Sequence, residues 1–463
     1  MQPPFDISAD LDTPVSTYLK LGPLKPRYLL ESVENGAHLA RYSFLGFGEV
    51  HEFRLDAAGL HVGGRHAARP VGRQEMLAAL RQALTDAPRL SPSVPDLPFA
   101  GGLVGVAGYD LVRQFERLPN APENAANPVA PDAAYLATDS LLVFDHLTRR
   151  IALLHAGSDA DRARLRSRVI ELLRGALPAA PAPGKHAAAA QSLTGDEFKQ
   201  AVAAAKRYIK SGDVYQLVLS VQFTGRHGLS PFETYRALRL LNPSPYMFFV
   251  DLGDIQVAGS SPEALVKLRQ GHASLRPIAG TRPRGATAEE DLAHEQALLA
   301  DEKENAEHVM LVDLARNDLG RVATAGSVHV APYRSIERYS HVMHIVSGVQ
   351  GELAAGKDAF DLFAAAFPAG TLVGAPKVRA MELIDELEPR RRGLYAGTVG
   401  YFGSNGDMDQ AIAIRTVIFR GDTYHYQAGA GLVADSVPET EYQEVLAKSA
   451  ILRSALAMAE EGL

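Results

Sequence analysis

Two acidic patterns, far apart in the chain, carry residues that could hold a metal ion. Glu304 and Glu307 lie three residues apart, and Glu441 and Glu444 repeat that spacing far downstream. On a helix, side chains at this spacing share one face, so each pair could present two carboxylates together. If both pairs met in one pocket, a cation would have to offset their repulsion, and oxygen-only ligands suit Mg²⁺. The same spacing is common on solvated helix faces, so either pair alone is a weak signal.

Two segments rich in glycine and proline contain groups that could bind an anion. In the first, Gly280 and Thr281 follow a predicted strand and would offer backbone N–H groups and a hydroxyl. In the second, Thr371 lies in a turn before a predicted helix, where unpaired N–H groups attract anions. An ordinary turn and simple helix capping would also explain these two segments.

Arg415 lies in an otherwise apolar stretch, residues 411–418, that predicts a buried strand. A buried arginine is costly without a partner, so we expect it to meet a carboxylate of the protein or of a ligand. An ion pair within the protein is the more frequent arrangement. Gly429, Ala430 and Gly431 end the next predicted strand, where main-chain donors could reach the same anion.

Composition is that of a soluble globular protein, with 46% hydrophobic and 22% charged residues in 463. This length allows two or three domains, or one large domain. No apolar run reaches the roughly 20 residues that span a bilayer, and residues 1–14 lack the apolar core of a secretion signal. The absence of Cys excludes disulfides and fits a cytoplasmic location. A net charge of −7 argues against nucleic-acid binding.

Residues 178–192, rich in Pro and Ala, predict an exposed linker between an N-terminal domain (1–177) and a C-terminal domain (193–463). Runs of strands with helices grouped between them favour an α+β fold built on antiparallel sheet. The predicted strands are 27–33, 38–44, 101–106, 141–144, 215–223, 246–251, 255–258, 264–268, 398–402, 409–419 and 423–430. The predicted helices are 73–87, 159–177, 194–211, 293–314 and 439–460.

Taken together, six segments resemble the chorismate-utilising enzymes, in particular anthranilate synthase component I. They occur in the order of that family and cover most of residues 194–456. The resemblance implies large antiparallel sheets packed as a sandwich with helices outside. The N-terminal half matches more loosely, through residues 29–32 and the glycine-rich strand at Gly101. The six segments are PIAGTRPRG, ENAEHVMLVDLARNDLGR, SHVMHIVSGVQG, FPAGTLVGAPKVRAMELIDELEP, RRGLYAGTVGY and AGAGLVADSVPETEYQEVLAK.

The resemblance implies that chorismate and ammonia give anthranilate and pyruvate, with Mg²⁺ required. By motif position, Glu307 and Glu444 would be direct Mg²⁺ ligands, and Glu304 and Glu441 would support them through water. The metal would hold the ring carboxylate of chorismate. The resemblance also implies that further residues bind the substrate: Gly280, Thr281 and Lys448 at the ring carboxylate, and Arg415, Tyr395, Gly429, Ala430 and Gly431 at the enolpyruvyl carboxylate.

The same resemblance implies the catalytic residues. Glu263 matches the general acid that protonates the departing C4 hydroxyl, a role that needs a carboxyl kept protonated near neutral pH. His341 matches the histidine of the elimination step, and Thr371 matches a threonine that contacts substrate. Gln216 lies where relatives that use water carry a lysine base. Ammonia is already a nucleophile, so a neutral amide suffices there.

The alternative within the family is aminodeoxychorismate synthase component I, which serves the folate and 4-aminobenzoate pathway. Many of its members carry a lysine that forms a covalent intermediate at the position of Ala279, where a methyl group cannot do that chemistry. Ala279 therefore favours anthranilate as the product. Val373, where a small polar residue is common in the family, is a minor departure.

Two further features of the resemblance concern regulation and partners. Ser32 and the stretch of Pro245, Tyr246 and Met247 match the family's tryptophan feedback site, although an ordinary strand and turn would also account for them. The chain has no Cys for a glutaminase reaction. We therefore expect ammonia from a separate glutamine amidotransferase subunit, component II of the family.

Overall fold

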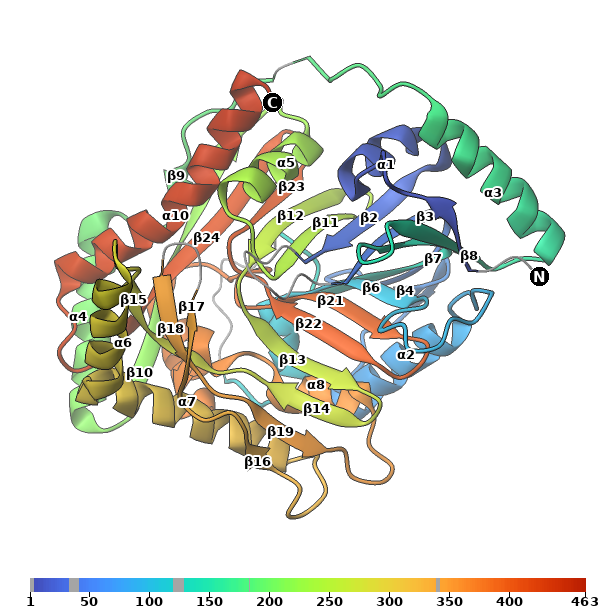
Figure 1. Cartoon of the computed structure of the whole chain (residues 1–463). Helices are drawn as coiled ribbons and strands as arrows, with labels where there is room; N and C mark the ends of the chain where they lie inside the picture. Colours follow the sequence, from blue (N-terminus) through green and yellow to red (C-terminus); the bar gives the residue numbers. More distant parts are fainter. Residues whose placement is uncertain (1–3, 33–40, 120–128, 183, 339–341) are drawn as a thin grey trace.

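The structure, a computed structural model, describes residues 4–32, 41–119, 129–182, 184–338 and 342–463. Within these residues, twenty-one strands join into one continuous curled sheet, and three more form a small separate sheet (Figure 1). The strand pairs of the described residues are antiparallel, and helices lie around the outside of the sheets. The predicted α+β class with large antiparallel sheets is therefore confirmed.

The chain before the Pro/Ala-rich segment forms one half of the strand layers and three α-helices within the described residues. These elements are β1 (Phe5–Ser8), α1 (Pro14–Lys20), β2 (Pro26–Glu31), β3 (Tyr42–Asp56), β4 (Gly59–Val62), β5 (Arg65–Ala67), α2 (Gly72–Asp86), β6 (Gly102–Ala107), β7 (Ala133–Asp145), β8 (Arg150–His155) and α3 (Asp159–Arg174). The predicted strand at 38–44 begins at Tyr42, and residues 38–40 lie outside the described residues.

The chain after that segment first forms a helix and a series of hairpins. The elements up to the small sheet are β9 (Ala190–Gln191), α4 (Gly195–Ser211), β10 (Gln216–Arg226), α5 (Pro231–Leu241), β11 (Tyr246–Asp251), β12 (Ile255–Ser261), β13 (Ala264–Arg269), β14 (His272–Leu275) and β15 (Ile278–Pro283). The rest are α6 (Ala288–Ala300), α7 (Glu302–Gly320), β16 (His329–Val330), β17 (Ser335–Arg338), β18 (Val342–Val346), β19 (Val349–Glu352), α8 (Ala359–Ala366), β20 (Gly374–Ala375), α9 (Lys377–Leu387), β21 (Thr398–Gly403), β22 (Met408–Ile412), β23 (Thr416–Arg420), β24 (Thr423–Leu432) and α10 (Pro438–Glu461).

Strands from before and after the Pro/Ala-rich segment are hydrogen-bonded neighbours. β2 pairs with β11, where Leu29 lies opposite Phe249, and β6 pairs with β21, where Gly105 lies opposite Gly400. The close approach at β6 needs glycine, because a Cβ on Gly105 would lie 2.0 Å from the carbonyl oxygen of Ala134. Both parts of the chain are thus joined through main-chain hydrogen bonds.

Alternating residues of these strands bury both faces of the sheet. Leu29 and Phe249 belong to one buried apolar cluster, whereas their neighbours Tyr28 and Phe248 belong to a second. Successive side chains of a strand point to opposite faces, so the two clusters are the two sides of the same strands. This burial on both faces explains why the strand sequences are nearly continuous runs of apolar residues.

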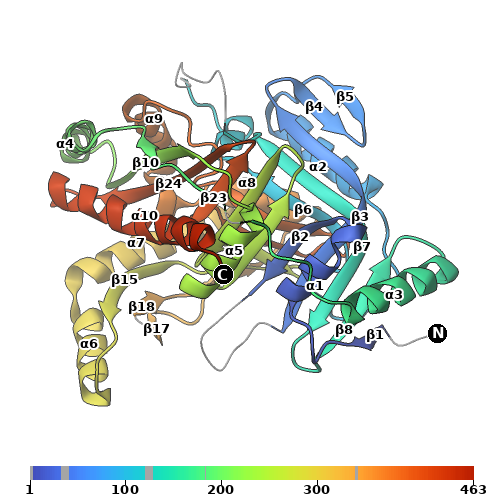
Figure 2. The same ribbon diagram turned by 90° about the horizontal axis from the view of Figure 1, so that it is seen from above.

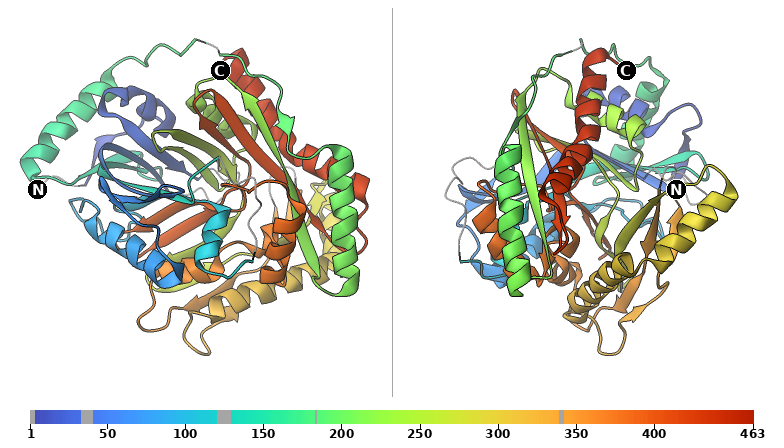
Figure 3. Two further views of the ribbon diagram at one scale, coloured as in Figure 1. Left: turned by 180° about the vertical axis from the view of Figure 1, so that it is seen from behind. Right: turned by 90° about the vertical axis from the view of Figure 1, so that its left-hand side faces the viewer.

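Helices cover the outer surfaces of the strands. α10 packs on β24, α5 and α4, and α2 packs on α8. Seen from above, α10 and α4 lie on one flank of the molecule and α2 and α3 on the other (Figure 2). The view from behind shows the same separation, and the small sheet lies beside α6 and α7 at one corner (Figures 2 and 3).

Two predicted elements are interrupted in the structure. The helix predicted at 293–314 is two helices, α6 and α7, because the Asp301 side chain accepts hydrogen bonds from the N–H groups of Lys303 and Glu304 and starts a new helix. The strand predicted at 409–419 is also two, β22 and β23, because Arg415 between them has a left-handed backbone with φ of 49°.

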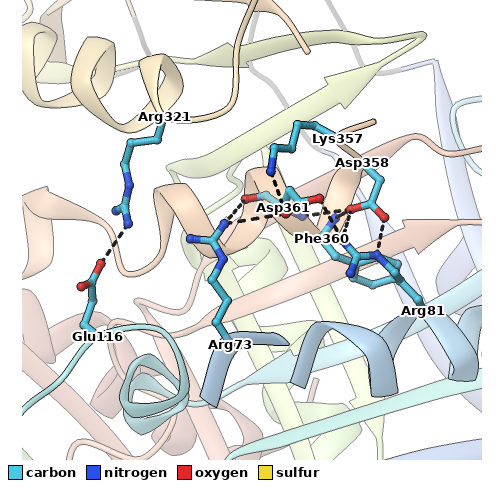
Figure 4. Close-up of polar contacts among 8 residues, drawn as sticks. All are labelled: Arg73, Arg81, Glu116, Arg321, Lys357, Asp358, Phe360 and Asp361. Atoms are coloured by element: carbon cyan, nitrogen blue, oxygen red, sulfur yellow. Dashed lines mark hydrogen bonds and ion pairs between the residues drawn. The ribbon is translucent and has the colours of Figure 1, made fainter. Parts of the chain in front are cut away.

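An ion-pair cluster joins α2 to the start of α8 across the two parts of the chain (Figure 4). Arg81 donates to Asp358 at 2.6 Å and to Asp361 at 2.8 Å. Asp358 also caps α8 by accepting from the N–H groups of Phe360 and Asp361. One carboxylate therefore serves both the helix start and the contact with α2.

None of the helices within the described residues combines the length and the apolar character that a bilayer crossing requires.

Candidate functional site

The two acidic pairs lie at the starts of two helices that meet in space. Glu304 and Glu307 lie in the first two turns of α7, and Glu441 and Glu444 lie in the first two turns of α10. Burial raises the pKa of Glu307, and the charges of Glu304 and Glu444 raise it further. Burial also raises the pKa of Glu441, and the charge of Glu444 raises it further. Since charges shift a pKa over short distances, the structure brings both pairs to one place.

Two of these four carboxylates have cationic partners. Lys448 Nζ lies 2.6 Å from Glu444 Oε1, and Arg282 Nη1 lies 3.2 Å from Glu304 Oε1. Among the described residues, no group of three His, Asp or Glu side chains is arranged closely enough to hold a metal ion. The donors are all oxygen, which suits Mg²⁺, and their mutual repulsion is what a bound cation would relieve. The residue types therefore fit a magnesium ion.

Gln216 lies at the start of β10 and faces this acidic cluster. Its Nε2 donates to Glu307 Oε1 at 3.3 Å, and the side chain is only 6% exposed. Its Oε1 is buried without a hydrogen-bond partner among the described residues. A Cβ on Gly431 would lie 3.1 Å from Gln216 Nε2, so the glycine leaves room for this amide. Gln216 thus presents an acceptor in the acidic cluster, which suits a ligand that can donate a hydrogen bond.

Gly280 allows β15 to approach the first acidic pair closely. Its φ is 71°, and the register of β15 with β18 shifts at this residue. A Cβ there would lie 3.0 Å from Leu298 Cδ1 and 3.2 Å from Glu304 Oε2. Any larger residue would meet both a strained backbone and a crowded space. The predicted neighbour Thr281 places its hydroxyl 3.1 Å from His344 Nδ1.

His344 is a member of this site that sequence reasoning missed. Its Nδ1 lies 3.0 Å from the carbonyl oxygen of Gly280, an arrangement that requires the tautomer with the lone pair on Nε2. Burial lowers the pKa of His344, and the charge of Arg415 lowers it too, so the ring is neutral near pH 7. The alternation of Val342, His344 and Val346 along β18 was the available signal. The predicted His341 lies outside the described residues.

Glu263 lies between β12 and β13, where it meets Thr371. The Thr371 hydroxyl donates to Glu263 Oε1 at 3.0 Å. Burial raises the pKa of Glu263 to about 7, although Thr371 and the charge of Lys448 both oppose the rise. A carboxyl group with this pKa carries its proton in a large part of the molecules at neutral pH. It is therefore able to act as a general acid.

The glycine-rich end of β24 forms another wall of the site. Gly429, Ala430 and Gly431 lie opposite Ser220, Leu219 and Val218 of β10. Lys448 donates to the carbonyl oxygen of Gly429 at 3.2 Å. A Cβ on Gly429 would lie 2.7 Å from the Tyr395 hydroxyl oxygen, so glycine makes room for this phenol. Burial raises the pKa of Tyr395, which keeps the hydroxyl as a hydrogen-bond donor.

Arg415 is not the buried strand residue that was predicted, whereas a ligand carboxylate as its partner stays a prediction. It lies at the break between β22 and β23 and is exposed. Its Nη1 donates to Asn242 Oδ1 at 3.1 Å, and no ion pair involves it within the described residues. The left-handed turn carries the side chain out of the apolar strand, which reduces the cost of burial that motivated the prediction. Partial desolvation lowers its pKa, and the cation remains available for an anionic ligand.

A large cavity of about 470 Å³ lies apart from the acidic cluster. All four residues predicted for the inhibitor, Ser32, Pro245, Tyr246 and Met247, line it. Tyr246 donates from its hydroxyl to Asp409 at 3.0 Å. Sequence reasoning missed its basic residues, which only the folded chain brings together: Arg41, Lys267, Arg269 and Arg276.

Comparisons with known proteins identify relatives of this chain. The model of the family described as "chorismate binding enzyme" matches residues 25–454. Anthranilate synthase component 1 of Acinetobacter calcoaceticus is 47% identical, over 98% of this chain and 95% of the relative. The protein of the same name from Thermus thermophilus is 45% identical, over 98% of this chain and 97% of the relative. The crystal structure of anthranilate synthase component I from Streptococcus pneumoniae superposes with a TM-score of 0.80 at 36% identity, covering 98% of this chain and 100% of that one.

The chain therefore belongs to the family of chorismate-binding enzymes. Within this family, the resemblance to anthranilate synthase component I that the six segments indicated is confirmed. The chain is an enzyme that uses chorismate.

Proposed function

We propose that this chain converts chorismate and ammonia into anthranilate and pyruvate, the first step of tryptophan biosynthesis. Ammonia would come from glutamine through a partner amidotransferase subunit, and tryptophan would inhibit the reaction. The observation that carries this proposal is Glu263, a carboxyl group with a pKa of about 7 that is held by Thr371. It supplies the proton that lets the C4 hydroxyl of chorismate leave as water.

Gln216 has the position and chemistry of a group that orients ammonia. Its buried amide lies against Glu307, and its acceptor oxygen could receive a hydrogen bond from the nucleophile. Ammonia needs no base to attack C2, so an amide is sufficient where water would need a lysine. Addition at C2 with loss of the C4 hydroxyl gives an amino intermediate and water.

His344 is our candidate for the base of the elimination step, in place of the predicted His341. Its neutral ring keeps the lone pair on Nε2, as the Gly280 contact requires. Removal of the C2 proton, with departure of enolpyruvate, makes the ring aromatic and releases pyruvate. We expect His344→Asn to lower kcat by about 100-fold or more, in the range of general acid–base catalysis. His341→Asn, as the matched variant, should retain most activity. The reverse result would make His341 the candidate base again.

Substrate binding follows from the charges around the site. Arg415, with Tyr395 and the main chain of Gly429–Gly431, would bind the enolpyruvyl carboxylate, because an arginine fork matches a planar carboxylate. Thr281, Gly280 and Lys448 would assist at the ring carboxylate. Mg²⁺, held by Glu307 and Glu444 with Glu304 and Glu441 in support, would neutralise that carboxylate when bound.

The large cavity supports the proposed tryptophan site. Its lining includes an aromatic hydroxyl, apolar side chains and several cations, which together suit an aromatic amino acid. We propose that residues 1–177 contribute to this regulation and that residues 193–463 carry the catalytic groups, with 178–192 connecting them.

The products test the proposal. The chain, supplied with chorismate, Mg²⁺ and ammonium at alkaline pH, should form fluorescent anthranilate and an equal amount of pyruvate. An amino product that retains the enolpyruvyl group, without pyruvate, would instead identify aminodeoxychorismate synthase. Absence of both products from a folded sample would contradict the proposal.

A further inference from the structure

Arg276 lies between the large cavity and the catalytic groups. It follows β14 and lines the large cavity, and it also lines a small pocket of about 40 Å³ beside Glu263 and Thr371. Ala264 is the other residue common to both linings, so Arg276 is the charged residue that they share. A ligand in the large cavity can therefore reach a side chain that also borders the general acid.

An ion pair links Arg276 to the strand that lies beside His344. Arg276 pairs with Glu337 of β17, and Glu337 lies directly opposite His344 in the pairing of β17 with β18. The charge of Glu337 acts on His344. The side chains of Arg276 and Glu337 are 52% and 32% exposed, so water weakens their attraction and either can exchange partners at small cost.

The other cations of the large cavity have partners that do not connect to the catalytic strands. Lys267 pairs with Asp409 at 2.8 Å, and Arg41 pairs with Asp145 at 2.9 Å. Arg269 donates to the carbonyl oxygen of Asp96 at 2.7 Å. If a ligand carboxylate bound one of these cations, only the surroundings of the cavity would rearrange. If it bound Arg276, the contact with the strand beside His344 would break.

The small sheet of β15, β18 and β17 carries several groups of the catalytic site. It is separate from the large sheet, and its order places β18 in the middle. Its own small buried cluster consists of Leu298 of α6 with Met343 and Ile345 of β18. β18 carries His344, and β15 carries Gly280 and Thr281, so a tilt of this sheet would displace three groups of the catalytic site together.

We propose that Arg276 couples the large cavity to the catalytic site. The carboxylate of an amino acid in the large cavity takes the Arg276 guanidinium, the Arg276–Glu337 ion pair opens, and the small sheet shifts His344 and Thr281 away from their working positions. This inference rests on the proposed function and names how its regulation is transmitted. The ligand must interact differently with the two arrangements, and the exchange of Glu337 for a ligand carboxylate at Arg276 supplies that difference.

The absence of Trp from the sequence makes the experiment direct. Because the chain contains 16 Tyr and no Trp, bound tryptophan can be excited selectively above the tyrosine absorption band, and its anisotropy reports binding. Anthranilate formation at increasing tryptophan reports inhibition, expressed relative to the uninhibited rate of each variant. The two curves are compared for the unaltered chain, Arg276→Gln, and Arg269→Gln as a matched control that lines only the large cavity.

Arg276→Gln should uncouple binding from inhibition. We expect substantial residual activity at tryptophan concentrations that saturate binding. Reciprocally, chorismate should weaken tryptophan binding by about 5- to 150-fold in the unaltered chain, and by less than about threefold in Arg276→Gln. Arg269→Gln should shift binding and inhibition to higher tryptophan in parallel, with full inhibition at saturation.

Full inhibition of Arg276→Gln at saturation would overturn the coupling role. If that variant fails to fold or to bind tryptophan, Glu337→Gln tests the coupling role instead, because Glu337 lies outside the cavity lining. Glu337→Gln should bind tryptophan as the unaltered chain does and retain residual activity at saturation, and complete inhibition would again overturn the inference. If the unaltered chain bound no tryptophan or formed no anthranilate, the proposed function itself would fail.

Discussion

Glu263 and Glu307 are the same residue type in one site, yet their surroundings suit them to different work. Glu263 is enclosed and has a threonine donor, and burial raises its pKa to about 7. Glu307 is less enclosed and lies among other carboxylates and an amide, a setting for binding a cation. Environments that separate the proton affinities of two carboxyl groups assign them different roles.

The pH dependence of kcat should follow the proton on Glu263. The acid form is the active one, so at a fixed concentration of free ammonia the rate should fall as pH rises above about 7. The Thr371 hydrogen bond lowers the pKa of Glu263, so Thr371→Val should move this alkaline limb to higher pH. A pH–rate series on both proteins measures the shift. Thr416→Val, a buried threonine that donates to the Ile414 carbonyl, is the control and should leave the limb in place.

Arg415 should be more sensitive to geometry than to charge. Arg415→Lys keeps the cation but loses the paired donors, so we expect the KM for chorismate to rise by about tenfold, a change of about 1.4 kcal/mol. Steady-state kinetics with chorismate as the varied substrate measures this. Arg226→Lys, in a surface pair with Asp422, should leave KM unchanged. An unchanged KM in Arg415→Lys would remove Arg415 from the binding site.

At the level of single residues, the prediction of the site from the sequence was uneven. The structure places Thr371 against Glu263 and Gln216 against Glu307, while the catalytic roles of these residues stay predictions. The exposure of Arg415 depends on one left-handed backbone angle, which an apolar sequence pattern does not encode. His344 was missed because a histidine on an alternating strand is ordinarily structural.

At the scale of elements, most helix and strand starts follow from local signals. Thr194 and Glu197 form the capping box of α4, and Gly212 ends it in a left-handed conformation, which bounds the helix predicted at 194–211. The break between α6 and α7 was missed because an aspartate also occurs inside helices, and the pattern around Asp301 continues through it. The pairing of β2 with β11 could not be read from one sequence, because it joins residues more than 200 positions apart.

Alanine substitutions at Gly280 and Gly212 would distinguish the effect of backbone strain from the effect of close approach to neighbouring atoms. Both have positive φ, at 71° and 84°, but a Cβ on Gly212 would meet nothing within 4 Å. Gly212→Ala should lose only about 1 kcal/mol of unfolding free energy and keep its activity. Gly280→Ala should lose more stability and most of its activity, because its Cβ would press on Leu298 and Glu304. Denaturant unfolding and anthranilate formation measure the two effects, and equal activities would contradict the close-approach argument.

At the scale of the whole molecule, the two parts of the chain form one connected structure. β2–β11 and β6–β21 join them through the main chain, and Arg81 joins α2 to α8 at Asp358 (Figure 4). The large cavity is lined from both parts, by Ser32 and by Tyr246. The resemblance predicted that these residues share one inhibitor site, and the structure places them in the lining of one cavity.

Tryptophan should therefore stabilise both parts of the chain together. At a concentration about 100 times its Kd, it should add about 2.7 kcal/mol to the free energy of unfolding. Differential scanning calorimetry should show the whole unfolding transition moving to higher temperature, whereas alanine, which lacks the indole ring, should have no effect. Two transitions of which only one moves would contradict a cavity shared by both parts.

We propose that α7 and α10 hold one cation between them. Mn²⁺, a paramagnetic substitute for Mg²⁺, can be titrated into the chain with and without chorismate, and the free ion can be counted by electron paramagnetic resonance. We expect one bound Mn²⁺ per chain, with affinity lost in Glu307→Gln and equally in Glu444→Gln. Binding that survives either substitution would contradict a site shared by the two helices.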